Sequence, residues 1–538
     1  MPKSSIRQRE KGDLWIWATG SMVTIALLMI LVLLGVILVN GLGYFWPKPL
    51  AEMRLTDGSV LAGEITSRET SERGGEQIAS VKLKMGNRDL YGLDFRWVEA
   101  RNIESEIYPE DLLKLERLEH GDFFGRIVSV QAREKIEWKA EGPAARLRQL
   151  KKALADEVDA VEDLKRTMST KSRKLGALRL DLLKLNYRNR ERNAERIKQV
   201  ETEQAALDKA VLAAQKAYET ALLELEQNRV VMVEAGGMEQ EVRVIDIVRM
   251  VEPNALLFGQ KMGVYFSKVW ELLSDSPRES NTEGGLFPAI FGTVMMVFIM
   301  SIFCMPLGVV AAIYLVEYAK EGPIVRVVRI AVNNLAGVPS IVYGVFGLGF
   351  FVYGVGGSID ELFFPERLPE ATFGTGGILW ASLTLALLTV PVVIVATVES
   401  LNSIPRGMRE GSLALGATKF QTVARVLLPM ASPGILTGFI LSMARAAGEV
   451  APLMLTGVIK SVQSLPLDAT APFLHLDRKF MHLGFHIYDV GFQSPNVEAA
   501  KPMVFVTTLL LLLIVIALNI VAIRIRNRMR QKYTMGAF

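Results

Sequence analysis

The 538-residue sequence contains a single cysteine, Cys304, which lies inside an apolar run. One thiol excludes an intrachain disulfide and any metal site built from several cysteines. The sequence also lacks a GxxxxGK[ST] phosphate loop, a GxSxG nucleophile motif and a dinucleotide fingerprint. We therefore expect no catalytic residue, no cofactor bound by this chain and no ATP hydrolysis by this chain alone.

Histidine is also scarce, with four residues in the whole sequence. His482 and His486 have the helical spacing of a metal pair, but no carboxylate pattern such as HExxH accompanies them. We expect no metal site. The formal net charge is only +4, and we expect no nucleic-acid partner.

Long apolar runs are abundant, and half of all residues are hydrophobic. The first run, Leu14–Val39, is long enough to cross about 30 Å of hydrocarbon and is followed by no convincing cleavage site, so it predicts an uncleaved anchor. Five more runs predict spans at Leu286–Tyr318, Ile330–Val355, Gly376–Val398, Gly434–Thr456 and Pro502–Ile523. The fold class is therefore a mostly α membrane protein with six transmembrane helices in a lipid bilayer.

The charges of the short connections predict the orientation of these helices. Basic residues gather in the loop 317–329, in the loop 399–433 and in the C-terminal tail, whereas the loop Ser358–Glu370 is acidic. Because cytoplasmic loops carry the excess of Lys and Arg, both termini are expected in the cytoplasm. Residues 1–47 then form the N-terminus and anchor, 48–285 an extracytoplasmic domain, and 286–538 the remaining membrane domain.

The extracytoplasmic domain has two kinds of sequence. Alternating segments broken by turn signals at Asp57-Gly58, Gly86-Asn87 and Gly121-Asp122 predict hairpins in a β-rich unit. Residues 143–228 instead repeat apolar residues at steps of three and four, which predicts a coiled-coil hairpin whose tip is the polar stretch Asn186–Asn193. Its role stays open between an arm that contacts a partner and a solvated spacer.

The loop at 399–433 predicts a docking surface. A helical stretch over Arg409–Leu415 is broken at Gly416, and a second helix from Ala417 to Leu428 is expected to stop at Pro429. Two short helices joined by a turn, on the side where basic residues gather, are a shape that a groove on a partner protein can hold.

The next span carries a charged pair, Arg445 and Glu449. A separation of four residues places both side chains on one face of a helix, within reach of a salt bridge. Ionisable groups inside a span are costly and mark a function by default, but a structural ion pair between helices is the alternative. If the substrate is an oxyanion, Arg445 supplies the attraction and Glu449 tunes it.

The loop resembles the EAA loop of ABC-importer permeases, through Glu410, Ala414, Gly416 and the Leu428-Pro429 pair. Three blocks, Ala331–Phe351, Ala444–Gly457 and His482–Pro495, resemble the A-type permease subunits of phosphate-specific ABC importers, in a long form with an extra domain. The resemblance implies a type I importer permease fold and a translocation pathway at Arg445 and Glu449. It also implies ATPase coupling through the following residues: Glu410, Gly411, Ala414, Leu415, Gly416, Ala417 and Pro429.

The partners implied by the resemblance are a second homologous permease, two cytoplasmic ATPase subunits that bind ATP with magnesium, and a periplasmic phosphate-binding protein. The sequence thus predicts a bacterial inner-membrane permease that imports inorganic phosphate. A permease for sulfate or another oxyanion is one alternative. A membrane scaffold or signalling subunit that transports nothing is another, although such a subunit needs neither a docking loop nor an intramembrane charged pair.

Overall fold

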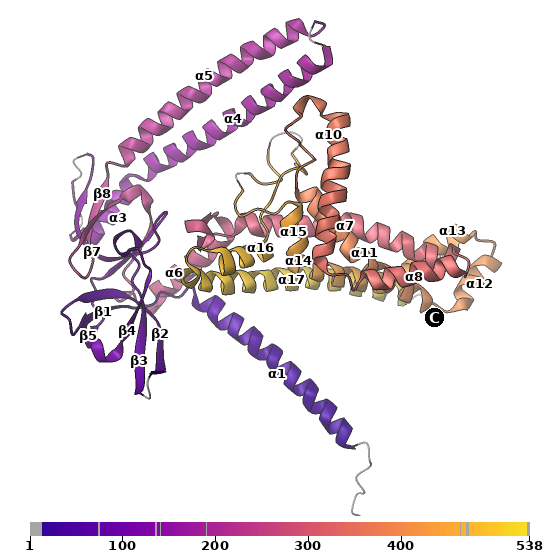
Figure 1. Ribbon diagram of the computed structural model, residues 1–538, viewed down its shortest axis with the longest axis horizontal. Coiled ribbons are helices and arrows are strands. Elements are labelled where there is room, and N and C mark those ends of the chain that lie inside the picture. The colour runs from indigo at the N-terminus through magenta and orange to yellow at the C-terminus, as the bar shows by residue number, and fades with distance from the viewer. Residues whose placement is uncertain are drawn as a thin grey trace, which may run out of the picture.

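The computed structural model describes residues 13–73, 76–134, 137–139, 141–189, 191–462, 464–469 and 473–534. Six helices in this part of the chain are long and apolar enough to cross a membrane, as predicted. Figure 1 shows three regions: a helical bundle, a β-rich domain at one end of the bundle, and a long helical hairpin that extends from the β-rich domain. The first membrane helix, α1 (Asp13–Gly43), leaves the bundle at an angle.

The β-rich unit consists of two antiparallel five-stranded sheets. The first has the strand order β4-β3-β2-β1-β5 and the second the order β10-β6-β7-β8-β9. The bounds of the strands are β1 Leu50–Leu55, β2 Val60–Arg73, β3 Glu76–Lys84, β4 Phe95–Glu99, β5 Ile103–Ile107, β6 Leu113–Arg117, β7 Phe123–Gln131, β8 Arg229–Val233, β9 Glu239–Arg243 and β10 Ile247–Val251. The turn glycines Gly58, Gly86 and Gly121 all have positive φ, a conformation that glycine adopts at little steric cost.

The helical hairpin is inserted between two paired strands. Helix α3 (Pro143–Ala153) follows β7, α4 (Ala155–Asn189) and α5 (Ala194–Leu225) pack against each other, and the chain then returns to β8, which pairs with β7. The hairpin reaches the membrane domain, because α4 contacts the short turn Pro365–Arg367 and Arg173 forms a 3.5 Å ion pair with Asp468. It therefore lies over loops of the bundle (Figure 1).

The membrane domain is built around α7 (Phe287–Ile313) and α11 (Ile378–Asn402), which pack together, with α14 (Leu428–Gly448) against α11 and α17 (Val497–Thr534) against α14. Close approach requires glycine at two of these crossings. A Cβ atom at Gly308 would lie 2.6 Å from Val393, and one at Gly438 would lie 2.3 Å from Ala396. The remaining helices are shorter: α8 Pro323–Leu335, α9 Ser340–Phe346, α10 Gly357–Phe363, α15 Ala451–Thr456 and α16 Leu483–Tyr488.

Two predicted spans have the wrong bounds. The span expected at Ile330–Val355 is instead Ser340–Phe363, because α8 ends at Leu335 and α9 begins after Pro339. Proline has no N–H to donate and its ring disfavours a helical conformation of the preceding residue, which separates the two helices. The span expected at Gly434–Thr456 is instead Lys419–Gly448.

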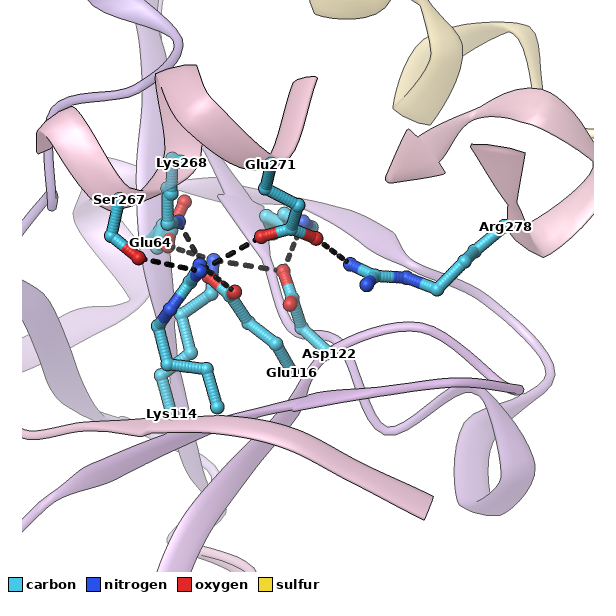
Figure 2. Close-up of polar contacts among 10 residues, drawn as sticks. Glu64, Lys114, Glu116, Asp122, Ser267, Lys268, Glu271 and Arg278 are labelled. Carbon is cyan, nitrogen blue, oxygen red and sulfur yellow. Dashed lines mark hydrogen bonds and ion pairs between the residues drawn. The ribbon is translucent and has the colours of Figure 1, made fainter. Parts of the chain in front are cut away.

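A buried ion-pair cluster, shown in Figure 2, joins the β-sheets to helix α6. Lys114 lies 2.8 Å from Glu64 and 2.9 Å from Asp122. Arg249 lies 2.8 Å from both Glu116 and Glu271. The other members are Lys84, paired with Asp122, Lys268, paired with Glu116, and Arg278, paired with Glu271. Glu271 and Lys268 belong to α6 (Phe258–Ser274), which precedes α7, so the cluster fixes α6 to the β-rich unit.

Glu283 borders this cluster in the short strand β12 (Glu283–Gly284), and no ion pair joins it to another described residue. Burial, and then the negative charge of Asp122, raise the pKa of this carboxyl to about 7, against the opposing effect of Lys84 and Lys114. The native state therefore binds the proton more tightly than the unfolded state. The free energy of unfolding therefore falls as the pH rises from about 4.5 to 7. Above pH 7 Glu283 is ionised in both states, and the full destabilisation is present.

We expect Glu283→Gln to stabilise the protein at pH 8 and to have little effect at pH 4.5. The gain at pH 8 is no more than about 3.5 kcal/mol, because one pKa unit corresponds to about 1.4 kcal/mol. Thermal unfolding of the purified chain at both pH values measures this difference, with the exposed Glu104→Gln as control. An equal shift at both pH values would attribute the effect to packing instead of ionisation.

Candidate functional site

The charged pair lies where a membrane helix breaks. Helix α14 ends at Gly448, Glu449 has an extended backbone (φ −78°, ψ 132°), and α15 starts at Ala451. Arg445 in the last turn donates from Nε to Glu449 Oε1 at 3.4 Å. The pair is therefore present, but Glu449 caps the helix end and does not sit on the helical face that the sequence predicted.

Arg445 keeps most of its binding capacity. In the described part of the chain Glu449 is its one hydrogen-bond partner, and the 3.4 Å distance is long for a charge-assisted bond, which is usually 2.7–2.9 Å. The side chains of Arg445 and Glu449 are 34% and 21% exposed. A half-satisfied guanidinium next to a helix break is suited to bind an oxyanion, because its planar fork matches two oxygen atoms.

The docking segment folds as two short helices, α12 (Arg406–Ala414) and α13 (Lys419–Thr422). Gly416 between them has φ +84°, a conformation that favours glycine. Thr418 caps α13 through a reciprocal pair of hydrogen bonds with Gln421, and Ser412 and Thr422 are joined at 2.9 Å. Local hydrogen bonds thus fix the turn.

The docking segment presents a row of apolar side chains. The exposed fractions are 91% for Leu415, 73% for Phe420 and 49% for Leu413. Of the other predicted coupling residues, Glu410, Gly411, Ala414 and Gly416 are exposed, and Ala417 and Pro429 are half-buried. Exposed aromatic and leucine side chains on an ordered turn are typical of a protein interface.

The prediction that Pro429 stops the second helix is wrong. A π turn over Val423–Leu427 precedes α14, and the chain continues as one helical span from Lys419 to Gly448. In this turn the Leu428 N–H donates to the Val423 carbonyl, five residues back. The wider turn places Pro429, which has no N–H, near the start of α14, where proline is tolerated.

One continuous helical segment therefore connects the docking segment to the charged pair. Leu428 and Arg445 are 17 residues apart, which corresponds to roughly 25 Å along a helix. The docking segment lies at the end of the bundle opposite the β-rich domain (Figure 1). The docking segment and Arg445 thus lie on one continuous helical segment, which includes the π turn Val423–Leu427 and Pro433.

Sequence reasoning missed a second attachment of the docking segment. Arg409 Nε donates to Glu317 Oε1 at 2.9 Å, and the same guanidinium donates to the carbonyls of Leu401 and Ile404. Glu317 lies in the π turn Tyr314–Tyr318 that follows α7, and its side chain is only 11% exposed. The segment is therefore fixed to two membrane helices. A separation of 92 residues gives no pairing signal in a single sequence.

The two histidines are buried. His482 caps α16 by accepting from the Gly484 N–H at 3.1 Å, and His486 lies 3.3 Å from Thr507. No group of three or more His, Cys, Asp or Glu side chains arranged for a metal ion occurs among the described residues.

Comparisons with known proteins find relatives of the membrane domain. Residues 304–532 match the family model of the binding-protein-dependent transport system inner membrane component. The chain is 38% identical over 180 residues to the phosphate transport system permease protein PstA of Mycobacterium leprae, covering 33% of this chain and 53% of that protein. It is 31% identical over 223 residues to the probable ABC transporter permease protein YqgI of Bacillus subtilis, covering 40% and 70%.

Among solved structures, the MetNI methionine ABC transporter in inward-facing conformations is 20% identical, with a TM-score of 0.34, over 45% of this chain and 95% of the other. The chain spans about half the length of the first phosphate transport permeases that it matches. The six apolar helices and the family match identify a multi-pass membrane protein. The chain belongs to the inner membrane components of binding-protein-dependent transport systems, the permeases of ABC transporters. The β-rich domain lies outside the matched residues.

Proposed function

We propose that this chain is the permease subunit of an ABC importer that moves inorganic phosphate across the bacterial inner membrane. The observation that carries the proposal is Arg445, a cation at a helix break whose terminal nitrogens have no hydrogen-bond partner in the described part of the chain. Arginine binds phosphate through two parallel hydrogen bonds. The names of relatives such as the Mycobacterium leprae protein support phosphate as the anion.

The proposed assembly contains a second homologous permease, two cytoplasmic ATPase subunits and a periplasmic phosphate-binding protein. The ATPase binds ATP with magnesium, and its closure moves the docking segment and, through the helix from Lys419 to Gly448, the charged pair. Both termini are cytoplasmic and residues 48–285 are periplasmic. The basic loops and the position of the β-rich domain opposite the docking segment support this orientation (Figure 1).

Uptake of radiolabelled phosphate tests the proposal. Cells that lack their own phosphate permease, supplied with this chain and its partner subunits, should accumulate labelled phosphate and not labelled sulfate. Accumulation of sulfate would reassign the substrate to another oxyanion. An intact membrane complex that transports neither anion would favour the scaffold function.

A further inference from the structure

A cavity of about 500 Å³ lies where the β-rich domain meets the ends of α1 and α17. The charged cluster of Figure 2 forms part of its wall on the β-rich side. The membrane helices contribute apolar side chains, Val39 from α1 and Phe505 from α17, and α6 contributes Val264 and Leu272. Glu498 and Lys501 at the start of α17 also line the cavity, so its wall combines charged side chains with the apolar side chains of the membrane helices, which is not the lining expected for a small soluble ion.

The cavity lies at the level of a membrane surface. Helix α6 separates it from the outside: Lys268 and Glu271 face the cavity, whereas Phe266 and Trp270 are 61% and 70% exposed. Phe258, at the start of α6, is 72% exposed and packs against Trp46, which follows α1. Exposed aromatic side chains on an amphipathic helix are typical of the membrane–water interface.

The wall carries a formal excess of one positive charge. Eight Lys and Arg side chains line the cavity against seven Asp and Glu side chains, and one of the latter is Glu283, whose pKa is raised to about 7. Most of the cations are paired with carboxylates. Lys48, which follows the end of α1 at Gly43 by five residues, is the exception: it is exposed, and no ion pair or hydrogen bond joins it to another described residue. Among the lining carboxylates, the exposed Glu69 likewise has no ion pair to another described residue.

The geometry points to a phospholipid site: an anionic phospholipid places its phosphodiester against Lys48 in this cavity and its acyl chains along the crossing of α1 and α17. The two helices are in contact there, since a Cβ at Gly41 would lie 2.9 Å from Leu509. A lipid in this position stabilises the joint between the β-rich domain and the membrane domain. The inference does not depend on which anion the permease transports.

Lipid binding to the full-length purified chain tests the proposal. After removal of native lipid, dioctanoyl phosphatidylglycerol is titrated and followed by native mass spectrometry, with dioctanoyl phosphatidylcholine and inorganic phosphate as comparison ligands. Wild-type protein should bind phosphatidylglycerol saturably, and Lys48→Glu should bind it at least fivefold more weakly. Lys261→Glu on α6, which does not line the cavity, should bind as wild type does.

A steric variant tests the same site without changing its charge. Gly43 lines the cavity at the end of α1, and no atom lies within 4 Å of a Cβ placed there, so Gly43→Phe should fill space and weaken binding without a clash. Equal binding by all variants overturns the site. Equal affinity for phosphatidylcholine overturns its preference for an anionic lipid. Displacement of phosphatidylglycerol by inorganic phosphate overturns the lipid assignment and makes the cavity a phosphate site.

Discussion

Arg445→Ala is expected to lower phosphate uptake at least tenfold while the chain remains in the membrane and bound to its partners. The guanidinium has one long hydrogen bond, at 3.4 Å, so its removal breaks no tight native network. The substitution instead weakens binding of the phosphate anion, because a hydrogen bond to a charged group contributes about 1.5–3 kcal/mol. Uptake rate and membrane abundance, measured on the same cells, separate the two effects.

Arg445→Lys is the matched control. Lysine keeps the positive charge but lacks the planar fork that binds two oxygen atoms at once. We expect it to restore part of the uptake and to weaken discrimination between phosphate and sulfate. Normal uptake by Arg445→Ala would show that the charged pair only stabilises the helix break between α14 and α15 and does not bind the substrate.

Glu449 gives the complementary test. Its carboxylate competes with the substrate for Arg445, so Glu449→Gln should bind phosphate more tightly and release it more slowly. The expected result is a lower KM for uptake together with a lower maximal rate. A variant that lowers uptake without changing KM would assign Glu449 to the stability of the helix end.

Local patterns predicted much of this architecture. Apolar runs longer than about 20 residues gave the six membrane helices, and the glycines at Gly58 and Gly416 lie where the chain turns with positive φ. Apolar runs and turn glycines depend only on residues that are close together in the sequence. They can therefore be recognised in a single sequence.

The features that sequence reasoning missed are of two kinds. Some join residues that are far apart in the sequence, and one depends on whether the chain ends a helix or continues it through a wider π turn. The ion pair of Glu317 with Arg409 joins residues far apart in the sequence, and so does the cluster around Lys114 and Asp122. The π turn before Pro429 replaces the expected stop because a wider turn tolerates the missing N–H at less cost than ending a membrane helix. The span ends at Gly448 and not at Thr456, so Arg445 lies in its last turn and not in its middle.

Gly416→Asp is expected to reduce co-purification of the ATPase at least tenfold. The turn has φ +84°, which costs a residue with a Cβ about 1–2 kcal/mol, although no atom lies within 4 Å of the new Cβ. The larger cost arises at the interface, because the carboxylate would be buried beside Leu415 and Phe420. An unpaired buried charge at an interface costs about 2–5 kcal/mol. The yield of ATPase bound to the affinity-purified chain measures the effect.

Gly416→Asn separates these two costs. Asparagine adopts the left-handed conformation about as readily as aspartate but carries no charge, so it should retain most of the ATPase. Gly357→Asp, in α10 outside the docking segment and with an open Cβ position, controls for an added charge elsewhere on the chain. If Gly416→Asp retains the ATPase at the wild-type yield, the segment from Arg406 to Thr422 is an ordinary connector and the helix to Arg445 transmits no ATPase movement.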